Sequence, residues 1–234
     1  MSGLSHSILN FLALATSESS RFPGKPLEVI NGKSMISRVW EKCVEAIDRD
    51  SVLIATDDKR ILDHCEEEGM KVIMTSKECK TGTDRIAEVA LSFKADTYIN
   101  VQGDEPMISS SELRGFIKYS QENPDFIINA MTPIKDEEEY IDSNVPKVVI
   151  NQQSELLYMS RSSIPGNKEG KFNSANKQVC IYAFPRKAIF AFGNNPKKTK
   201  FEAIEDIEIL RFLEMGFSIQ MVEVKGSPIA LDTP

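Results

Sequence analysis

The sequence predicts an α/β fold with a Rossmann-like, mostly parallel central sheet, flanking helices and a smaller inserted lobe. Up to residue 131, short apolar runs alternate with longer segments of helical periodicity. Such runs are typical of strands buried on both faces, and their alternation with helices is typical of parallel sheets with right-handed crossovers. The alternation is lost over residues 132–200 and returns at residue 201. We therefore expect one domain, 1–234, with its core at about 1–131 and 201–234 and the lobe at about 132–200.

Composition and charge narrow the class of protein. The chain has 234 residues, of which 41% are hydrophobic and 27% charged, with a net charge of −7. These values fit an ordinary globular domain and argue against broad nucleic-acid binding. No apolar run approaches the roughly 20 residues of a membrane span, so no membrane insertion is expected. The four cysteines are scattered without a CxxC pair, which fits free thiols in a reducing cytoplasm.

The first half of the chain supplies most of the expected sheet. Apolar runs predict strands at residues 8–14, 50–56, 70–75, 98–101 and 126–131. Apolar residues at helical spacing predict helices at 34–46, 59–69, from 85 onward and at 110–123. Ser34 is placed to cap the first helix, and Gly69 to end the second. In such a sheet the carboxyl ends of the strands form the edge where ligands bind.

A loop rich in hydroxyl groups, glycine and proline follows the first strand, at residues 15–26. It carries two cations four residues apart, Arg21 and Lys25. Backbone N–H groups together with arginine and lysine suit a polyphosphate, although the GxxxxGK[ST] pattern of a Walker A loop is absent. The alternative is a polar turn without a ligand.

The segment KTGTDR, at residues 80–85, leads into the third expected helix. We expect Thr83 or Asp84 to cap a helix that starts at Arg85. The amino end of a helix, with small hydroxyl residues and an arginine, suits an anion or the polar edge of a base. The alternative is a well-capped helix without a ligand.

The fourth strand is followed by QGDEP, at residues 102–106. Gly103 permits backbone geometry that other residues resist, and Pro106 cannot extend a ladder, so Asp104 lies just past the strand's carboxyl end. Mg²⁺ is often held by one or two carboxylates plus substrate phosphates. Asp104 is therefore a candidate metal ligand, and Asp232, which ends a short apolar run, is a second. Solvated acidic turns are the alternative.

The pattern is less regular from residue 132. Strand-like runs at 147–150, 156–160 and 179–184 are separated by polar turns and by a loop rich in glycine and proline. A helix is expected at 201–215, with an apolar stripe at helical spacing, Gly216 as its stop and its acidic residues on a solvated face. Residues 218–224 are the last expected strand.

Several motifs together resemble the 3-deoxy-manno-octulosonate (Kdo) cytidylyltransferases, the CMP-Kdo synthetases. They are SSRFPGKPL at 19–27, INGK at 30–33, ATDD at 55–58, TGTDR at 81–85, NVQGDEP at 100–106, LYMSRSSIP at 157–165, IYAF at 181–184, the helix around 205–211, and LDTP at 231–234. Each string alone is weak. Because all of them occur in family order and cover nearly the whole chain, the match is specific.

The resemblance implies the fold of the nucleotide-diphospho-sugar transferases and the reaction of CTP with Kdo to give CMP-Kdo and pyrophosphate, for lipopolysaccharide or surface-polysaccharide biosynthesis. Attack on the α-phosphorus requires neutralisation of the triphosphate, by Mg²⁺ and by cationic side chains. The resemblance also implies a homodimer formed through the middle lobe.

The resemblance assigns roles residue by residue. The expected catalytic residues are Arg21, Lys25 and Asp104, and the expected Mg²⁺ ligands are Asp104 and Asp232. The nucleotide would be bound by Thr16, Ser19, Arg21, Lys25, Thr81, Gly82 and Arg85. The sugar acid would be bound by Gln102, Arg161, Gln178, Tyr182 and Glu208. Arg161 would meet the sugar carboxylate, which suits a bidentate guanidinium.

Two departures from the family pattern bear on function. The first loop of the family usually begins Ile-Pro-Ala-Arg, whereas this chain ends the corresponding run with Thr16. Losing one charge-assisted hydrogen bond to the triphosphate costs roughly 1.5–3 kcal/mol. A histidine common in the family is Gln178 here, and the glycine of the following Gly-Ile-Tyr strand is Cys180. The alternatives are therefore the same chemistry on a related acid (amino-Kdo or sialic-type), a catalytically impaired paralogue that binds nucleotide or sugar, or another nucleotidyltransferase.

Overall fold

The structure, a computed structural model, describes residues 10–16, 25–102 and 109–225. Its strands are β1 (Asn10–Thr16), β2 (Val29–Ile30), β3 (Lys33–Ser34), β4 (Val52–Thr56), β5 (Val72–Met74), β6 (Thr97–Gln102), β7 (Ile127–Pro133), β8 (Lys147–Ile150), β9 (Leu156–Ser160), β10 (Asn176–Pro185) and β11 (Ile219–Glu223). Its α-helices are α1 (Met35–Ala46), α2 (Lys59–Glu67), α3 (Gly82–Ser92), α4 (Ser110–Glu122), α5 (Glu137–Ile141), α6 (Arg186–Gly193), α7 (Lys200–Glu205) and α8 (Ile209–Glu214). Each strand expected from the sequence is present.

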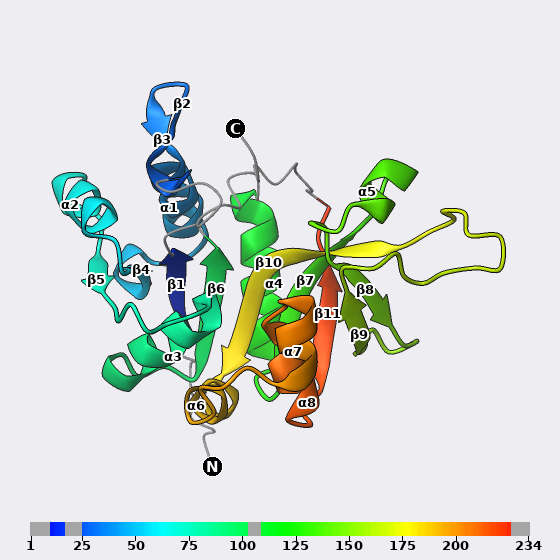
Figure 1. Cartoon of the computed structure of the whole chain (residues 1–234). Helices are drawn as coiled ribbons and strands as arrows, with labels where there is room; N and C mark the ends of the chain where they lie inside the picture. Colours follow the sequence, from blue (N-terminus) through cyan, green and yellow to red (C-terminus); the bar gives the residue numbers. More distant parts are fainter. Residues whose placement is uncertain (1–9, 17–24, 103–108, 226–234) are drawn as a thin grey trace, which may run out of the picture.

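The main sheet follows the order β11-β7-β10-β6-β1-β4-β5, with β8 and β9 attached beside β10 (Figure 1). β1 pairs in parallel with β4 and β6, β4 with β5, and β11 with β7. The predicted class, α/β with a mostly parallel sheet, is therefore confirmed. No helix in the described ranges is long and apolar enough to cross a membrane.

Two separate cores cover the faces of the sheet. On one face, Val52 and Ile54 of β4 pack with apolar residues of α1, α2 and α4. On the other face, Leu53 of β4 and Tyr98 of β6 pack with apolar residues of α3, α6 and α8. Burial on both faces explains why the central strands read as continuous apolar runs instead of alternating ones.

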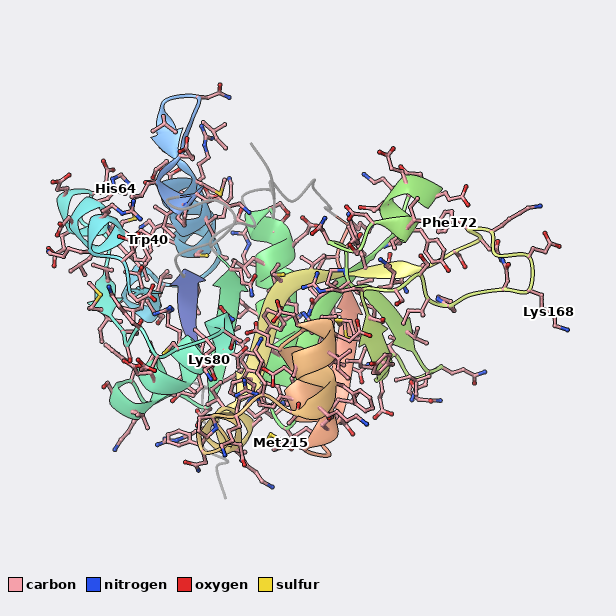
Figure 2. All side chains as sticks on the ribbon, viewed as in Figure 1. Trp40, His64, Lys80, Lys168, Phe172 and Met215 are labelled. Carbon is pink, nitrogen blue, oxygen red and sulfur yellow. The ribbon has the colours of Figure 1, made fainter. Side chains whose placement is uncertain are left out.

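The start of α1 confirms its predicted cap. Ser34 Oγ accepts a hydrogen bond from Ser37 N at 3.2 Å. The same hydroxyl lies 2.9 Å from His64 Nε2, so α2 is joined to the beginning of α1. Figure 2 shows His64 and Trp40 together on this side of the molecule. Gly69, with φ +67°, follows the end of α2 as predicted.

The position of β10 differs from the sequence expectation. Residues 179–184 are expected in the smaller lobe, whereas β10 lies between β6 and β7 and is antiparallel to both. Its first residues, Asn176 and Lys177, also pair with β8. One ten-residue strand therefore pairs both with the central strands β6 and β7 and with β8 of the smaller lobe. An apolar run predicts that a strand is buried but does not identify its neighbours. The division into core and lobe stays a prediction.

The helix expected at 201–215 is divided into α7 and α8. Asp206, which is left-handed with φ 52°, separates them. Because of this break, the predicted apolar stripe does not face one side. Phe201 and Ile204 are 41% and 68% exposed, while Ile207 and Leu210 are buried. The expectation of a solvated acidic face is wrong, because donors from other elements reach its carboxylates, as described below.

The smaller lobe contains the antiparallel pair β8–β9 and the short helix α5. The rings of Tyr140 in α5 and Phe172 lie 5.2 Å apart, and Tyr140 Oη donates to Pro165 O at 3.1 Å. These contacts attach both ends of the Gly- and Pro-rich loop to α5. Figure 2 shows Lys168 at the far tip of this loop, away from the sheet.

Candidate active site

The predicted ligand edge is formed by the carboxyl ends of β1, β4 and β6. In the pairing register, Thr16 lies beside Thr56, and Ala15 beside Gln102, so the three strands end at one level. Thr16 is described by its backbone alone, which is at this edge. Ser19, Arg21, Asp104 and Asp232 lie outside the described residues, and their roles stay predictions. Lys25 begins a short 3-10 helix, Lys25–Leu27, and is 5% exposed.

The amino end of α3 begins three residues earlier than predicted. The helix starts at Gly82, and its N-cap is Thr81 instead of Thr83 or Asp84. Thr81 Oγ1 accepts from Asp84 N at 3.1 Å, and Asp84 Oδ2 accepts from Thr81 N at 3.0 Å. This capping box satisfies two N–H groups reciprocally, which a cap at Asp84 would not do. Thr81 and Gly82 therefore stand at the start of the helix, as their predicted nucleotide role requires.

Arg85, the third predicted residue on α3, is fully buried. Its Nη2 lies 3.1 Å from Asp57 Oδ2, just after β4, and its Nη1 bonds to Thr75 Oγ1, just after β5. Arg85 thus holds α3 against the carboxyl ends of β4 and β5. Whether it also contacts the nucleotide stays a prediction.

Glu208 connects α8 to the ligand edge. Its Oε2 accepts from Thr83 N of α3 at 3.0 Å, and its Oε1 accepts from Gln102 Nε2, at the end of β6, at 3.3 Å. Burial raises the pKa of the Glu208 carboxyl, against the effect of hydrogen bonds from Thr83 and Thr81. The structure therefore brings together two residues predicted for the sugar, Gln102 and Glu208, although whether they bind it is untested.

Arg211, one turn after Glu208, fixes α8 at a second point. Its guanidinium makes two hydrogen bonds of 2.6 Å to Glu202 in α7 and one of 3.1 Å to Asp84 in α3. It also lies 3.7 Å from the ring centroid of Phe192 in α6. Both Arg211 and Glu202 are 0% exposed. A bidentate pair of this geometry compensates the loss of water around both charges.

A second polar group lies on β7 and β10. Asn129 Nδ2 donates to two carbonyl oxygens at the bulge of β10, at 2.9 Å each, and its Oδ1 accepts from Gln178 Nε2 at 2.9 Å. Tyr182 pairs with Asn129 of β7 and with Asn100 of β6, and it is 2% exposed. Gln178 and Tyr182, both predicted for the sugar, thus lie on the strand next to β6.

Arg161 follows β9 and is engaged by the backbone. Its Nε donates to Glu205 O at 2.6 Å, its Nη1 to Ser143 O at 3.1 Å and its Nη2 to Asp206 O at 3.0 Å. Its own N–H donates to the Glu205 carboxylate at 2.9 Å. Its guanidinium therefore already serves three carbonyl groups, and its predicted contact with a sugar carboxylate stays a prediction.

Asn129 and Asn100 have no role in the sequence predictions. Asn100 is fully buried, and neither atom of its amide has a hydrogen-bond partner in the part of the chain that the structure describes. Each asparagine lies between apolar residues inside a strand, and that signal could have identified both. Within the same ranges, no three His, Cys, Asp or Glu side chains gather closely enough to hold a metal ion.

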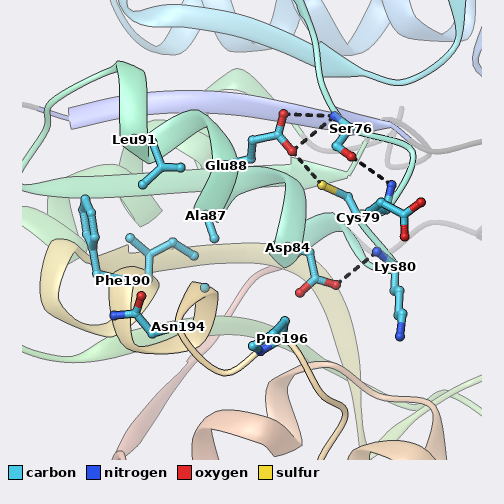
Figure 3. A pocket seen from close by; sticks show the side chains of 13 residues that line it. Ser76, Cys79, Lys80, Asp84, Ala87, Glu88, Leu91, Phe190, Asn194 and Pro196 are labelled. Atoms are coloured by element: carbon cyan, nitrogen blue, oxygen red, sulfur yellow. Dashed lines mark hydrogen bonds between the residues drawn. The ribbon is translucent and has the colours of Figure 1, made fainter.

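A cavity of about 330 Å³ lies between α3 and α6 (Figure 3). Its apolar wall includes Ala87, Leu91 and Phe190, and its polar end includes Cys79 and Lys80 from the segment before α3. The residues that line it do not include those predicted for nucleotide or sugar. The cavity therefore has no part in the site described here.

Cys79 in this cavity is expected to react slowly with alkylating reagents. Burial, a 3.2 Å hydrogen bond from Sγ to Glu88 Oε2 and the charge of Glu88 raise the pKa of the Cys79 thiol to about 12. An ordinary thiol, with a pKa of about 8.5, is roughly one quarter thiolate at pH 8, whereas Cys79 would be about 0.01% thiolate. Peptide mass spectrometry after iodoacetamide treatment should show labelling about 1000-fold slower than in the unfolded chain. Glu88→Gln should accelerate it, and equal rates in folded and unfolded protein would contradict the prediction.

Comparison with known proteins agrees with this arrangement. A family model described as cytidylyltransferase matches residues 11–220. The 3-deoxy-manno-octulosonate cytidylyltransferase of Protochlamydia amoebophila (strain UWE25) is 36% identical over 224 residues, covering 92% of this chain and 86% of the relative. The protein of the same name from Christiangramia forsetii is 38% identical over 221 residues, covering 93% and 89%.

A solved structure gives the same result. It is CMP:2-keto-3-deoxy-manno-octonic acid synthetase complexed with CTP, with a TM-score of 0.87 and 33% sequence identity, covering 97% of this chain and 94% of that chain. Agreement in sequence and in fold along almost the whole chain leaves one conclusion. The chain belongs to the 3-deoxy-manno-octulosonate cytidylyltransferase family.

Proposed function

We propose that this protein activates a 3-deoxy-2-ulosonic sugar acid, Kdo in the first instance, by transferring CMP to it from CTP. The anomeric hydroxyl oxygen of the sugar attacks the α-phosphorus, the bond from that phosphorus to the bridging oxygen breaks, and pyrophosphate leaves. The hydroxyl proton is released. The likeness to the CTP-bound CMP-Kdo synthetase, at 33% identity over 97% of the chain, carries the proposal. CMP-Kdo would serve lipopolysaccharide or surface-polysaccharide biosynthesis.

The ligand edge supports this assignment. The amino end of α3, with Thr81 and Gly82, adjoins the ends of β4 and β5 through Arg85. The dipole of α3 favours phosphates and polar base edges at this end of the helix. Arg21, Lys25 and Ser19 would hold the triphosphate from the first loop, with Thr16 at its start. Gln102, Gln178 and Tyr182 would face the sugar from β6 and β10.

Mg²⁺ is the proposed cofactor, and Asp104 and Asp232 are its proposed ligands. The metal would neutralise the triphosphate and the leaving pyrophosphate. The position of Asp104 supports the proposal, because β6 ends at Gln102, two residues before it, at the edge where ligands bind. Carboxylate oxygens also match the preference of Mg²⁺ for hard ligands.

We also propose a cytoplasmic homodimer. Four free cysteines support a reducing compartment. The dimer is proposed from the family resemblance, with the lobe of β8 and β9 as the contact region.

Pyrophosphate release from CTP and Mg²⁺, with and without Kdo, tests the main proposal. Release that depends on Kdo is the expected result. Release with an amino-substituted Kdo or a sialic-type acid, but not with Kdo, would favour the second candidate, which Gln178 supports because the residue replaces a common histidine of the family. Binding of CTP without release for any acid would favour an impaired paralogue, which Thr16 supports. UTP or GTP outcompeting CTP would favour a different nucleotidyltransferase.

Thr16→Arg is expected to raise kcat/KM for CTP. Thr16 ends β1 at the ligand edge, level with Thr56. An arginine there would add one charge-assisted hydrogen bond to the triphosphate, which corresponds to about 10- to 100-fold. Initial rates at several CTP concentrations give the comparison, and Thr16→Gln, which has similar reach but no charge, is the control. An unchanged kcat/KM in the arginine variant would show that Thr16 does not limit activity.

A further inference from the structure

Two glutamine side chains on neighbouring strands are each held by one end of their amide group. Gln102 ends β6, and Gln178 lies in β10, the strand next to it. The Nε2 atom of each donates a hydrogen bond to the protein, to Glu208 and to Asn129 respectively. Neither Oε1 atom accepts a hydrogen bond from the residues that the structure describes. Both side chains are half-buried.

Asn129 determines which end of the Gln178 amide faces it. Asn129 Nδ2 lies 2.9 Å from each of two backbone carbonyl oxygens, at Val179 and Ile181. Carbonyl oxygens accept only, so the NH₂ group of Asn129 must face them and its Oδ1 must face Gln178. That oxygen also accepts only, so Gln178 must offer it Nε2. The carbonyl oxygen of Gln178 is therefore left for another partner.

Glu208 has the same effect on Gln102. Its Oε2 accepts from the backbone N–H of Thr83, and its Oε1 faces Gln102. The Nε2 atom of Gln102 is the donor in this hydrogen bond, and Glu208 Oε1 accepts it at 3.3 Å. The carbonyl oxygen of Gln102, like that of Gln178, is left for another partner.

Both glutamines lie on the same face of the sheet. Gln178 pairs with Met131, which packs in one core with Tyr182 and with Phe212 of α8. Gln102 reaches Glu208 at the start of α8, so it faces the same helix. One face therefore presents two carbonyl oxygens near the end of β6.

We propose that Asn129 and Glu208 are positioning residues that orient Gln178 and Gln102, so that the sugar subsite offers hydrogen-bond acceptors and selects donor groups on the sugar acid. This inference rests on the proposed function and adds the polarity of the subsite to it. The donors would be hydroxyl groups or an ammonium group of the acid. A histidine in place of Gln178 could offer the sugar a donor or an acceptor according to its tautomer. The orientation imposed by Asn129 means that Gln178 offers only an acceptor, its Oε1 atom.

Substitution of the glutamines tests the acceptor role. Gln178→Met and Gln102→Met keep the length of the side chain and remove the amide. Each is expected to raise KM for the sugar acid about tenfold, as for one lost hydrogen bond, with KM for CTP changed less than twofold. Gln220→Met is the matched control, because Gln220 is an amide on β11 whose Nε2 donates to Gln153 O. It should change neither constant.

Double variants test the positioning role. In Glu208→Gln, the new amide can accept from Thr83 N and donate to Gln102, which would then turn its own NH₂ group outward. KM for the acid should rise about tenfold in this variant. Because Glu208 acts through Gln102, the double variant Glu208→Gln, Gln102→Met should lose no more than Gln102→Met alone. The same comparison applies to Asn129→Ser with Gln178→Met.

The outcomes separate this inference from the proposed function. If wild-type protein releases no pyrophosphate with any sugar acid, the proposed function fails, and calorimetric binding of the acids to the same variants then decides the inference. If wild type is active and the losses in the double variants add fully, the positioning role is overturned.

Sugar acids in which a single hydroxyl is replaced by a methoxy group test the acceptor polarity, because a methoxy group can only accept a hydrogen bond. At the contacted position, this replacement should lower the affinity of the wild-type protein for the acid about tenfold, and it should change the affinity of the methionine variants little. Comparing Kdo with amino-substituted Kdo identifies whether the donor is hydroxyl or ammonium, and equal affinity for every methoxy derivative would overturn the acceptor polarity.

Discussion

Arg211→Met is expected to lower the free energy of unfolding by about 3–5 kcal/mol, as when one partner of a buried ion pair is removed. Among the described residues, Glu202 would keep the backbone N–H of Thr199, at 3.1 Å, as its donor, although Glu202 is 0% exposed. The stacking on Phe192 would also be lost. Urea titration monitored by circular dichroism measures the change, and the melting temperature should fall by roughly 10 °C.

The double variant Arg211→Met, Glu202→Leu is the informative control. An apolar pair of similar volume can replace a buried ion pair at little cost, so this variant should recover at least half of the loss. Lys59→Met, which breaks the exposed pair with Asp63, should leave the urea midpoint almost unchanged. A loss below about 1 kcal/mol in Arg211→Met would mean that the buried cluster is not a main support of α8.

The fold class and the strands could be predicted from the sequence because one physical signal determines both. A central parallel strand must be apolar on both faces, and the sequence shows this as continuous apolar runs at 50–56 and 98–101. The sequence contains no comparable signal for which strands pair with one another. β10 is antiparallel to β6 and β7, but its apolar residues would read the same at any buried place in a sheet.

The acidic residues of α7 and α8 show why polarity alone does not predict exposure. Glu202, Glu205 and Glu208 recur at helical spacing and resemble a solvated face. In the structure each accepts hydrogen bonds from another element, from Arg211, from Ser160 and from Thr83 respectively. Contacts of this kind depend on tertiary structure, which helical periodicity does not report.

The candidate site was predictable in residue type but not in orientation. The strand-end position of Gln102 follows from a local signal, and the structure places it at the end of β6. The start of the next helix was predicted at Arg85, with Thr83 or Asp84 as its cap, whereas the structure caps α3 with Thr81. The direction of the Gln178 amide depends on Asn129, 49 positions away in the chain. Sequence reasoning had no means of linking these two residues, although the lone asparagine in an apolar strand was a visible anomaly.

Asp104→Asn is expected to reduce kcat by about 1000-fold or more while leaving stability within about 1 kcal/mol. The substitution keeps the size of the side chain and removes its charge, so Mg²⁺ loses an anionic oxygen ligand but the chain loses no packing. Pyrophosphate release measured against Mg²⁺ concentration gives both kcat and the apparent metal affinity. The apparent affinity should fall together with kcat, because the same carboxylate determines both.

Glu105→Gln is the matched control for Asp104, since it removes one carboxylate charge from the neighbouring position. If activity depended only on the total negative charge of this segment, Asp104→Asn and Glu105→Gln would lose similar activity. If Asp104 is a specific ligand, Glu105→Gln should stay within about tenfold of wild type at saturating Mg²⁺. In sequence, Asp104 follows the end of the buried strand β6 by two residues, and Glu105 follows it by three. Near-normal turnover in Asp104→Asn would remove Asp104 from the proposed metal site and leave the triphosphate to the cations of the first loop.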